Sequence, residues 1–151
     1  MNNISRKLYG FNEILENLLN NFQNNKLSNS IIFYGNEGIG KKTFAYYLIN
    51  RIFENFNINN SNLIYENIHP NVRLIEKIYE EKIKNLKNSI IIDQIKEIEK
   101  FIYHSSIDGL PKFIVIDSAD DLNIHSSNSL LKILEEPNKN TYFILLSHKI
   151  S

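Results

Sequence analysis

The sequence has no cysteine, and its 151 residues carry no excess charge of either sign. Without cysteine the chain can form neither a disulfide framework nor a Cys-based zinc site, and it has no thiol nucleophile. The 17 Lys and Arg balance 17 Asp and Glu, so the basic excess of proteins that bind DNA directly is missing. There is also no apolar run long enough to span a membrane and no signal-peptide core, so we expect a cytoplasmic protein without membrane contact.

The length and the 42% hydrophobic content are enough for one domain with a core, residues 1–151. Apolar residues three and four positions apart predict one helix within residues 4–30 and a second over 41–56. Between them, Ile31 to Tyr34 is a short apolar run that is typical of a strand buried on both faces. Similar runs at 113–117 and 141–146 predict two more strands, and this alternation indicates an α/β fold with a mostly parallel sheet.

The segments between these strands predict further elements. Residues 72–75 are a candidate strand, and the charged segment 76–87 is interpreted as a helix or an ordered excursion with a solvated face. Asp93 is expected to cap a helix that runs to about residue 104. Residues 126–136 predict another helix, which Pro137 ends. Its expected apolar stripe comprises Leu130, Leu131, Ile133 and Leu134.

A glycine-rich turn stands between the first strand and the second helix. Residues 35–41, GNEGIGK, fit the pattern G-x-x-x-x-G-K of a phosphate-binding P-loop. Glycines let the backbone approach a ligand, the N–H groups form an anion nest, and the helix beginning at Lys41 adds its positive dipole end. The alternative is a glycine-rich turn with no nucleotide role, but the strand before and the helix after favour a P-loop.

The residue after the P-loop lysine departs from the pattern. It should be Ser or Thr, whose hydroxyl holds Mg²⁺, but it is Lys42. Thr43 is one position later, rotated by about 100° around the helix, and cannot simply replace it. A second cation can help to bind phosphate but cannot ligate magnesium. The pattern therefore leaves ATP binding open and weakens the case for metal-assisted hydrolysis.

The strand at 113–117 ends in Asp117, the acid expected of a Walker B strand, which helps to hold Mg²⁺ in P-loop ATPases. The next residue is Ser118, which cannot serve as the carboxylate base that many such ATPases have there. Asp117 alone could also be an acid that caps a turn. Asp120 and Asp121 follow the strand and are expected to point elsewhere, as parts of a polar loop.

The candidate site is therefore a nucleotide site without a predicted catalytic residue or metal ligand. The four histidines, His69, His104, His125 and His148, show no ligand spacing, so surface or satisfied polar roles are expected. The candidate nucleotide-binding residues are Gly35, Gly38, Gly40, Lys41, Lys42, Thr43 and Asp117.

Five segments in order resemble the delta-prime family of bacterial DNA polymerase III subunits, which belongs to the AAA+ clamp-loader group. They are GNEGIGKKTFAYYL, HPNVRLIEK, DQIKEIEKFI, KFIVIDSADDLN and SSNSLLKILEEPNKNTYFILLSH. The likeness extends from about residue 8 to residue 148, and the block at 128–137 is its most specific part. It implies a P-loop NTPase (AAA+) three-layer fold. It also implies a subunit that helps to load the sliding clamp onto primed DNA as a rigid stator with a degenerate ATP site.

The chain also departs from the family. The resemblance implies a four-Cys zinc module after the P-loop helix, but residues 61–71 contain no cysteine, so zinc is not expected. It further implies a Ser-Arg-Cys motif, a last core strand, and helical lid and collar domains beyond the segment that ends at His148. We therefore expect the AAA+ core to be truncated before its last strand. That would leave the strand at 31–34 as an exposed apolar edge, with marginal stability or self-association as the result.

Three hypotheses on function remain open. The first is a stator-type subunit that acts by contact with other clamp-loader subunits and, through them, with the sliding clamp and primed DNA. The second is a working P-loop ATPase that uses ATP and Mg²⁺, which single-turnover hydrolysis abolished by Lys41→Ala would favour. The third is a non-functional remnant of a split or truncated gene.

Overall fold

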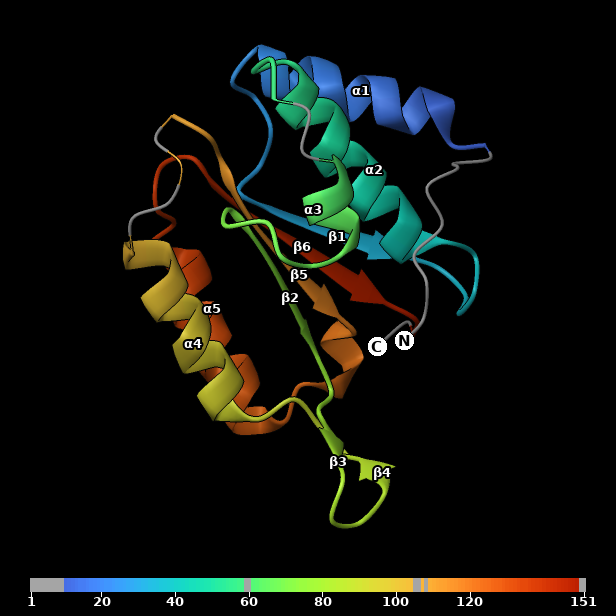
Figure 1. The fold of residues 1–151 in the computed structure, drawn as a ribbon, viewed down its shortest axis with the longest axis vertical. Coiled ribbons are helices and arrows are strands. Elements are labelled where there is room, and N and C mark those ends of the chain that lie inside the picture. Colours follow the sequence, from blue (N-terminus) through green and yellow to red (C-terminus); the bar gives the residue numbers. More distant parts are fainter. Residues whose placement is uncertain (1–9, 59–60, 105–106, 108, 150–151) are drawn as a thin grey trace.

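The computed structural model describes residues 10–58, 61–104, 107 and 109–149. Its centre is a sheet of four parallel strands in the order β1-β6-β5-β2 (Figure 1). Because all four strands run the same way, their carboxyl ends lie along one edge of the sheet. The strands are β1 (Ser30–Tyr34), β2 (Val72–Glu76), β5 (Lys112–Asp117) and β6 (Thr141–Ser147).

Helices cover both faces of this sheet and make three layers. On one face lie α1 (Asn12–Gln23), α2 (Lys41–Glu54) and the short α3 (Ser61–Tyr65). On the other face lie α4 (Ile92–Tyr103) and α5 (Ile124–Glu135), and Figure 1 shows the two groups on opposite sides of the strands. A 3-10 turn (Ala119–Asp121) follows β5. The described fold thus has the predicted α/β architecture with a parallel sheet.

The two central strands explain why both faces are covered. In β5, Phe113 and Val115 belong to the core under α1 and α2, whereas Ile114 and Ile116 belong to the core under α4 and α5. The side chains of β6 alternate in the same way, since successive residues of a strand point to opposite faces. These strands are apolar on both sides, so each needs a helical layer above and below.

The strand β1 differs from its prediction as a strand buried on both faces. Within the described residues it pairs only with β6, and its exposed and half-buried residues alternate. Ile32 is 65% exposed and Tyr34 is 51% exposed. The apolar run correctly indicated a strand, but its position at the edge of the sheet leaves one face open.

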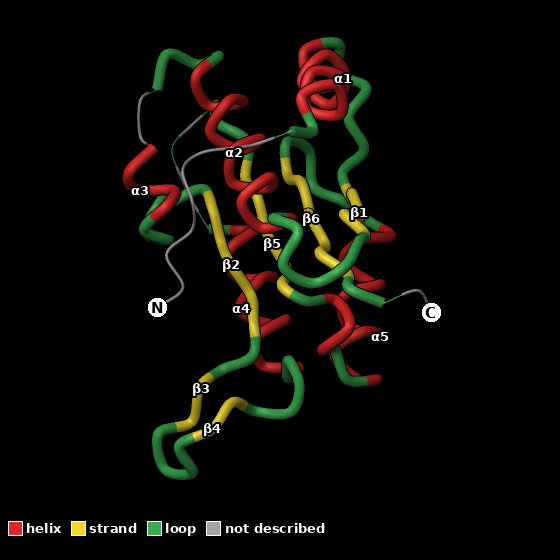
Figure 2. Tube along the Cα trace, turned by 90° about the vertical axis from the view of Figure 1, so that its right-hand side faces the viewer, coloured by secondary structure: helices red, strands yellow, loops and turns green. Residues whose placement is uncertain are grey.

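Two further predictions need correction. The segment after β2 forms a small antiparallel hairpin, β3 (Tyr79–Glu80) with β4 (Asn85–Leu86), that projects beyond the sheet (Figure 2), so it is an excursion and not a helix. Asp93 lies inside the first turn of α4 and is not its cap. The cap is Ile91, whose backbone N–H donates to Oε1 of Gln94 at 3.1 Å.

The first and last predicted helices also differ in part from the structure. Residues 4–9 of the first predicted helix lie outside the described residues, and α1 begins at Asn12. In α5, Leu130 is buried, but Leu131, placed in the same apolar stripe, is 55% exposed. Leu131 projects about 100° away from Leu130 around the helix, and in α5 this direction is open to solvent. No helix within the described residues is both long enough and apolar enough to cross a bilayer.

Two buried polar residues lie just before β2, in the segment HPN. The side-chain amide of Asn71 donates to the carbonyl oxygens of Leu110 and Pro111 at 3.3 and 3.4 Å. It also contacts Ile107, because its oxygen accepts from that backbone N–H at 3.1 Å. Asn71 is fully buried and joins the start of β2 to the turn before β5. This gives the HPN segment a structural role that the sequence did not reveal.

His69 lies beneath the same turn and is fully buried, contrary to a surface role. Its Nδ1 accepts from the backbone N–H of Asn71 at 3.0 Å, and its ring stacks on Phe53 with the centroids 4.8 Å apart. Its buried Nε2 has no hydrogen-bond partner among the described residues. Burial lowers the pKa of His69 from its ordinary value of 6.5, because a charged imidazole would lose its hydration there.

This burial predicts pH-dependent stability. In the unfolded chain His69 takes up a proton near pH 6.5, whereas in the folded chain it does so only at lower pH. The contribution of His69 to the free energy of unfolding is therefore complete above pH 6.5 and is lost as the pH falls below that value. The loss is at most about 1.4 kcal/mol per pH unit. Urea unfolding at several pH values should show this slope in the native sequence, and His69→Gln should flatten it. The exposed His125→Gln is the matched control, and an equal flattening there would contradict the assignment to His69.

Candidate functional site

The candidate site lies at the carboxyl edge of the sheet, where the segments after β1, β2, β5 and β6 meet. The P-loop connects β1 to α2, and the backbone N–H of Gly35 donates to the carbonyl oxygen of Ser147 at 3.2 Å. Glu76 ends β2, and Asp117 ends β5 in register with it. Ligand sites of parallel α/β sheets are typically found at this edge.

The loop itself has the geometry that its sequence predicts. Gly38 and Gly40 have φ angles of +82° and +95°, which residues with a side chain rarely adopt. Gly40 is the N-cap of α2, and its carbonyl oxygen accepts from the N–H of Phe44 at 2.9 Å. The first N–H groups of a helix have no partner within it, so the loop and α2 together present donors to an anion.

Lys41 folds back across this loop. Its Nζ donates to the carbonyl oxygens of Gly35 and Asn36 at 2.7 and 2.8 Å, and the residue is only 8% exposed. Burial lowers the pKa of Lys41, although Asp117, Asp120 and Glu37 oppose that change by favouring the charged amine. The lysine therefore fixes the shape of the loop and places a cation beside it.

Lys42 connects the loop with the acidic strand ends. Its Nζ lies 2.9 Å from Oε2 of Glu76 and 3.3 Å from Oδ2 of Asp117. The structure thus brings Lys42 and Asp117 together and adds Glu76, which is not among the residues predicted from the sequence. The signal was present, because Glu76 ends a candidate strand just as Asp117 does. Thr43, one position along α2, is half-buried.

Asp120 was expected to point away but belongs to this edge. Its carboxylate accepts from the hydroxyls of Ser118 and Ser147 and from the backbone N–H of His148, at 2.6 to 2.9 Å. Burial acts to raise the pKa of Asp120, but these hydrogen bonds outweigh it and hold the pKa below its ordinary value. Asp120 therefore ties the end of β5 to the end of β6. Ser118 serves as a cap in this network, since its Oγ also accepts from the N–H of Asp120.

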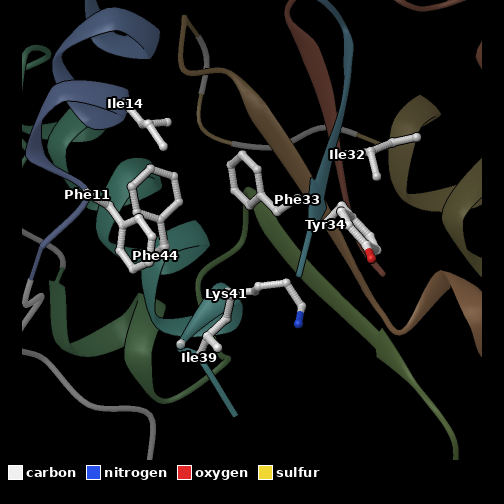
Figure 3. Close-up of a pocket in the computed structure, with 9 residues that line it drawn as sticks. Phe11, Ile14, Ile32, Phe33, Tyr34, Ile39, Lys41 and Phe44 are labelled. Carbon is white, nitrogen blue, oxygen red and sulfur yellow. The ribbon is translucent and has the colours of Figure 1, made fainter. Parts of the chain in front are cut away.

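An apolar pocket of about 250 Å³ adjoins the loop on the side of the open strand. Figure 3 shows that Phe11 and Ile14 approach it from α1 and its N-terminal end, and that Phe33 and Tyr34 come from β1. Ile39 and Lys41 line its border with the P-loop. The rings of Phe33 and Phe44 pack edge to face, with their centroids 5.0 Å apart. Sequence reasoning missed this pocket because its walls come from separate elements, and their placement beside one another depends on the fold.

The two halves of the site differ in the ligands that they fit. The glycine loop, Lys41 and the start of α2 suit the phosphates of a nucleotide such as ATP. The carboxylate side does not suit Mg²⁺, because an ammonium group lies where a hydroxyl ligand would be needed. In the part of the chain that the structure describes, no three His, Asp or Glu side chains are grouped to hold a metal ion.

Comparison with known proteins agrees with this architecture. A family model described as "DNA polymerase III, delta subunit" matches residues 10–151, nearly the whole chain. The chain belongs to this family. The match confirms the resemblance that the sequence segments indicated, in the N-terminal part of a clamp-loader type of subunit.

Two curated relatives carry the name DNA polymerase III subunit delta'. The one from Bacillus subtilis is 27% identical over 143 residues, which are 90% of this chain and 41% of the relative. The one from Pseudomonas aeruginosa is 28% identical over 89 residues, 59% of this chain and 25% of the relative. The chain thus spans about two-fifths or less of the length of these relatives.

A solved structure supports the fold alone. It is a DNA polymerase III gamma subunit-related protein from Thermotoga maritima MSB8, with a TM-score of 0.59 and 19% sequence identity. The match covers 88% of this chain and 38% of the other. The three-layer arrangement around a parallel sheet is therefore shared with this gamma subunit-related protein.

Proposed function

We propose that this chain is the P-loop module of a clamp-loader subunit similar to delta-prime. It would help to load the sliding clamp in DNA replication through contacts with the other clamp-loader subunits. The observation that carries the proposal is the family match along residues 10–151. The relatives named DNA polymerase III subunit delta' support the same assignment.

We propose further that the subunit acts as a stator and not as a motor. Lys42 is paired with Glu76 and Asp117 at the place where a motor would bind its magnesium ion. Ser118 is occupied in a cap with Asp120 and offers no carboxylate to activate water. A phosphate loop that has its backbone geometry but lacks these two functions fits a part that holds its shape while its neighbours hydrolyse ATP.

The partners follow from this role. The direct partners would be other clamp-loader subunits, and the sliding clamp and primed DNA would be reached through them. The balanced charge of 17 basic and 17 acidic residues suits contact with proteins better than direct binding to a DNA backbone. A role in replication would place the chain in the cytoplasm.

A co-purification experiment tests the assembly role. The tagged chain of 151 residues is mixed with the purified clamp-loader subunits of the same organism, and the bound fraction is measured after size-exclusion chromatography. We expect at least one clamp-loader subunit to co-elute with the tagged chain at micromolar concentration. The same subunit should not co-elute with an unrelated P-loop protein used as a control bait. Co-elution no greater than with that control bait would contradict the proposal.

A further inference from the structure

The ion cluster at the carboxyl edge joins three separate elements. Lys42 comes from the first turn of α2, Glu76 from the end of β2 and Asp117 from the end of β5. The side chains of Lys42 and Asp117 are 24% and 22% exposed, whereas that of Glu76 is 51% exposed. One ammonium group thus lies between two carboxylates, in a position that is partly shielded from water.

Two neighbouring lysines have other partners, and one histidine shares Asp117 with Lys42. Lys41 donates to the carbonyl oxygens of its own loop, and Lys77 lies 3.4 Å from the carboxylate of Asp121. Nε2 of His148 is 3.7 Å from Oδ1 of Asp117, on the carboxylate oxygen that Lys42 does not contact. Among the described residues, Lys42 is therefore the one cation that contacts both Glu76 and Asp117.

An ammonium group and a divalent cation exclude each other at this position. Mg²⁺ is bound by oxygen ligands with a free lone pair, whereas an ammonium nitrogen offers only donors. A positive charge within about 3 Å of the same carboxylate oxygens also repels a second cation strongly in partly shielded surroundings. Both carboxylates that would attract a metal are already paired with this ammonium, which balances one of their two negative charges.

We propose that Lys42 is a tethered cation that takes the place of Mg²⁺ and closes the Glu76–Asp117 pair to divalent metals. Its charge comes with the chain, so the edge of the sheet keeps the same electrostatic balance whether metal is abundant or absent. The reverse change follows from the same geometry. Lys42→Thr removes the ammonium from both carboxylates, leaves Asp117 with its contact to His148, and supplies a hydroxyl, and so opens the pair to a metal.

Binding of Mn²⁺ alone, measured by electron paramagnetic resonance of the free ion, tests this proposal without nucleotide or partner subunit. We expect Lys42→Thr to bind Mn²⁺ at least about tenfold more tightly than the native chain. Lys42→Thr combined with Asp117→Asn should lose that gain. Lys77→Thr is the matched control, because it removes a paired lysine from the same edge without freeing Glu76 or Asp117.

The native chain provides a second measurement that needs no variant. Its melting temperature should be the same in EDTA and in about 10 mM MgCl₂, because stabilisation by metal requires a site that binds it. A clear upward shift with magnesium would overturn the proposal. The proposal would also be overturned if the native chain or Lys77→Thr bound Mn²⁺ as tightly as Lys42→Thr does. A folded Lys42→Thr that binds Mn²⁺ no more tightly than the native chain would overturn it as well. The inference concerns the metal alone, so its failure would leave the assembly role untouched.

Discussion

Replacing Asn71 with alanine should lower the free energy of unfolding by about 2 to 3 kcal/mol. Asn71 is fully buried, and its amide group is shared among backbone groups of the turn before β5. Alanine would leave those groups buried without partners, at a cost larger than the net gain from one hydrogen bond. Urea unfolding followed by circular dichroism measures the change.

Asn20→Ala is the matched control for this loss. Asn20 is exposed on α1, and alanine is a better helix former, so its replacement should change stability by less than about 0.5 kcal/mol. Asn71→Leu is a second variant, because it keeps the branched shape of the side chain but replaces its polar atoms with methyl groups, and it should remain destabilising. If Asn71→Ala unfolded at the same urea concentration as the native chain, the turn would not depend on this amide.

We expect the chain of 151 residues to self-associate through β1, which has a neighbouring strand on one side only in the part of the chain that the structure describes, and Ile32→Lys should suppress this. Unpaired backbone groups along an apolar edge strand are a template for pairing with another chain, and an edge lysine is a usual protection. Ile32 is 65% exposed on this strand. Light scattering during size-exclusion chromatography should show a mass that rises with concentration for the native chain and a monomer for Ile32→Lys.

The control for the edge strand is Ile124→Lys at the start of α5. Ile124 is 73% exposed, so the substitution adds the same charge to an apolar surface position that has no unpaired strand beside it. It should leave the self-association of the chain unchanged. A native chain that runs as a single monomer with a high melting temperature would contradict the role given to β1.

The central strands could be predicted because both of their faces are buried. Phe113 to Ile116 are apolar without interruption, and such a run has one reading in a parallel sheet. The same rule misread β1, since an apolar run does not reveal whether a second neighbouring strand is present. Ile32 and Tyr34 are exposed because of the sheet order, which is a property of the whole fold.

The part of the site that is contiguous in the sequence was predicted, whereas the contacts between residues far apart in the sequence were missed. The glycine loop and Lys41 are one contiguous motif, so their sequence implied their shape. The pairing of Lys42 with Glu76 depends on the register of β2 against β5, and the bonds of Asp120 depend on where β6 ends. The spacing of residues along the chain reveals neither the strand register nor the position where β6 ends. The burial of His69 also became visible only once Phe53 was placed beside it.

The hydrogen bonds of Asp120 link the end of β5 directly to the end of β6. A single carboxylate is held by the hydroxyl of Ser118, just after β5, and by the hydroxyl of Ser147 and the N–H of His148, where β6 ends. A displacement of the chain at His148 would therefore act on the loop after Asp117 directly through these hydrogen bonds. Force or strain applied where β6 ends would reach the P-loop edge within one side chain's length.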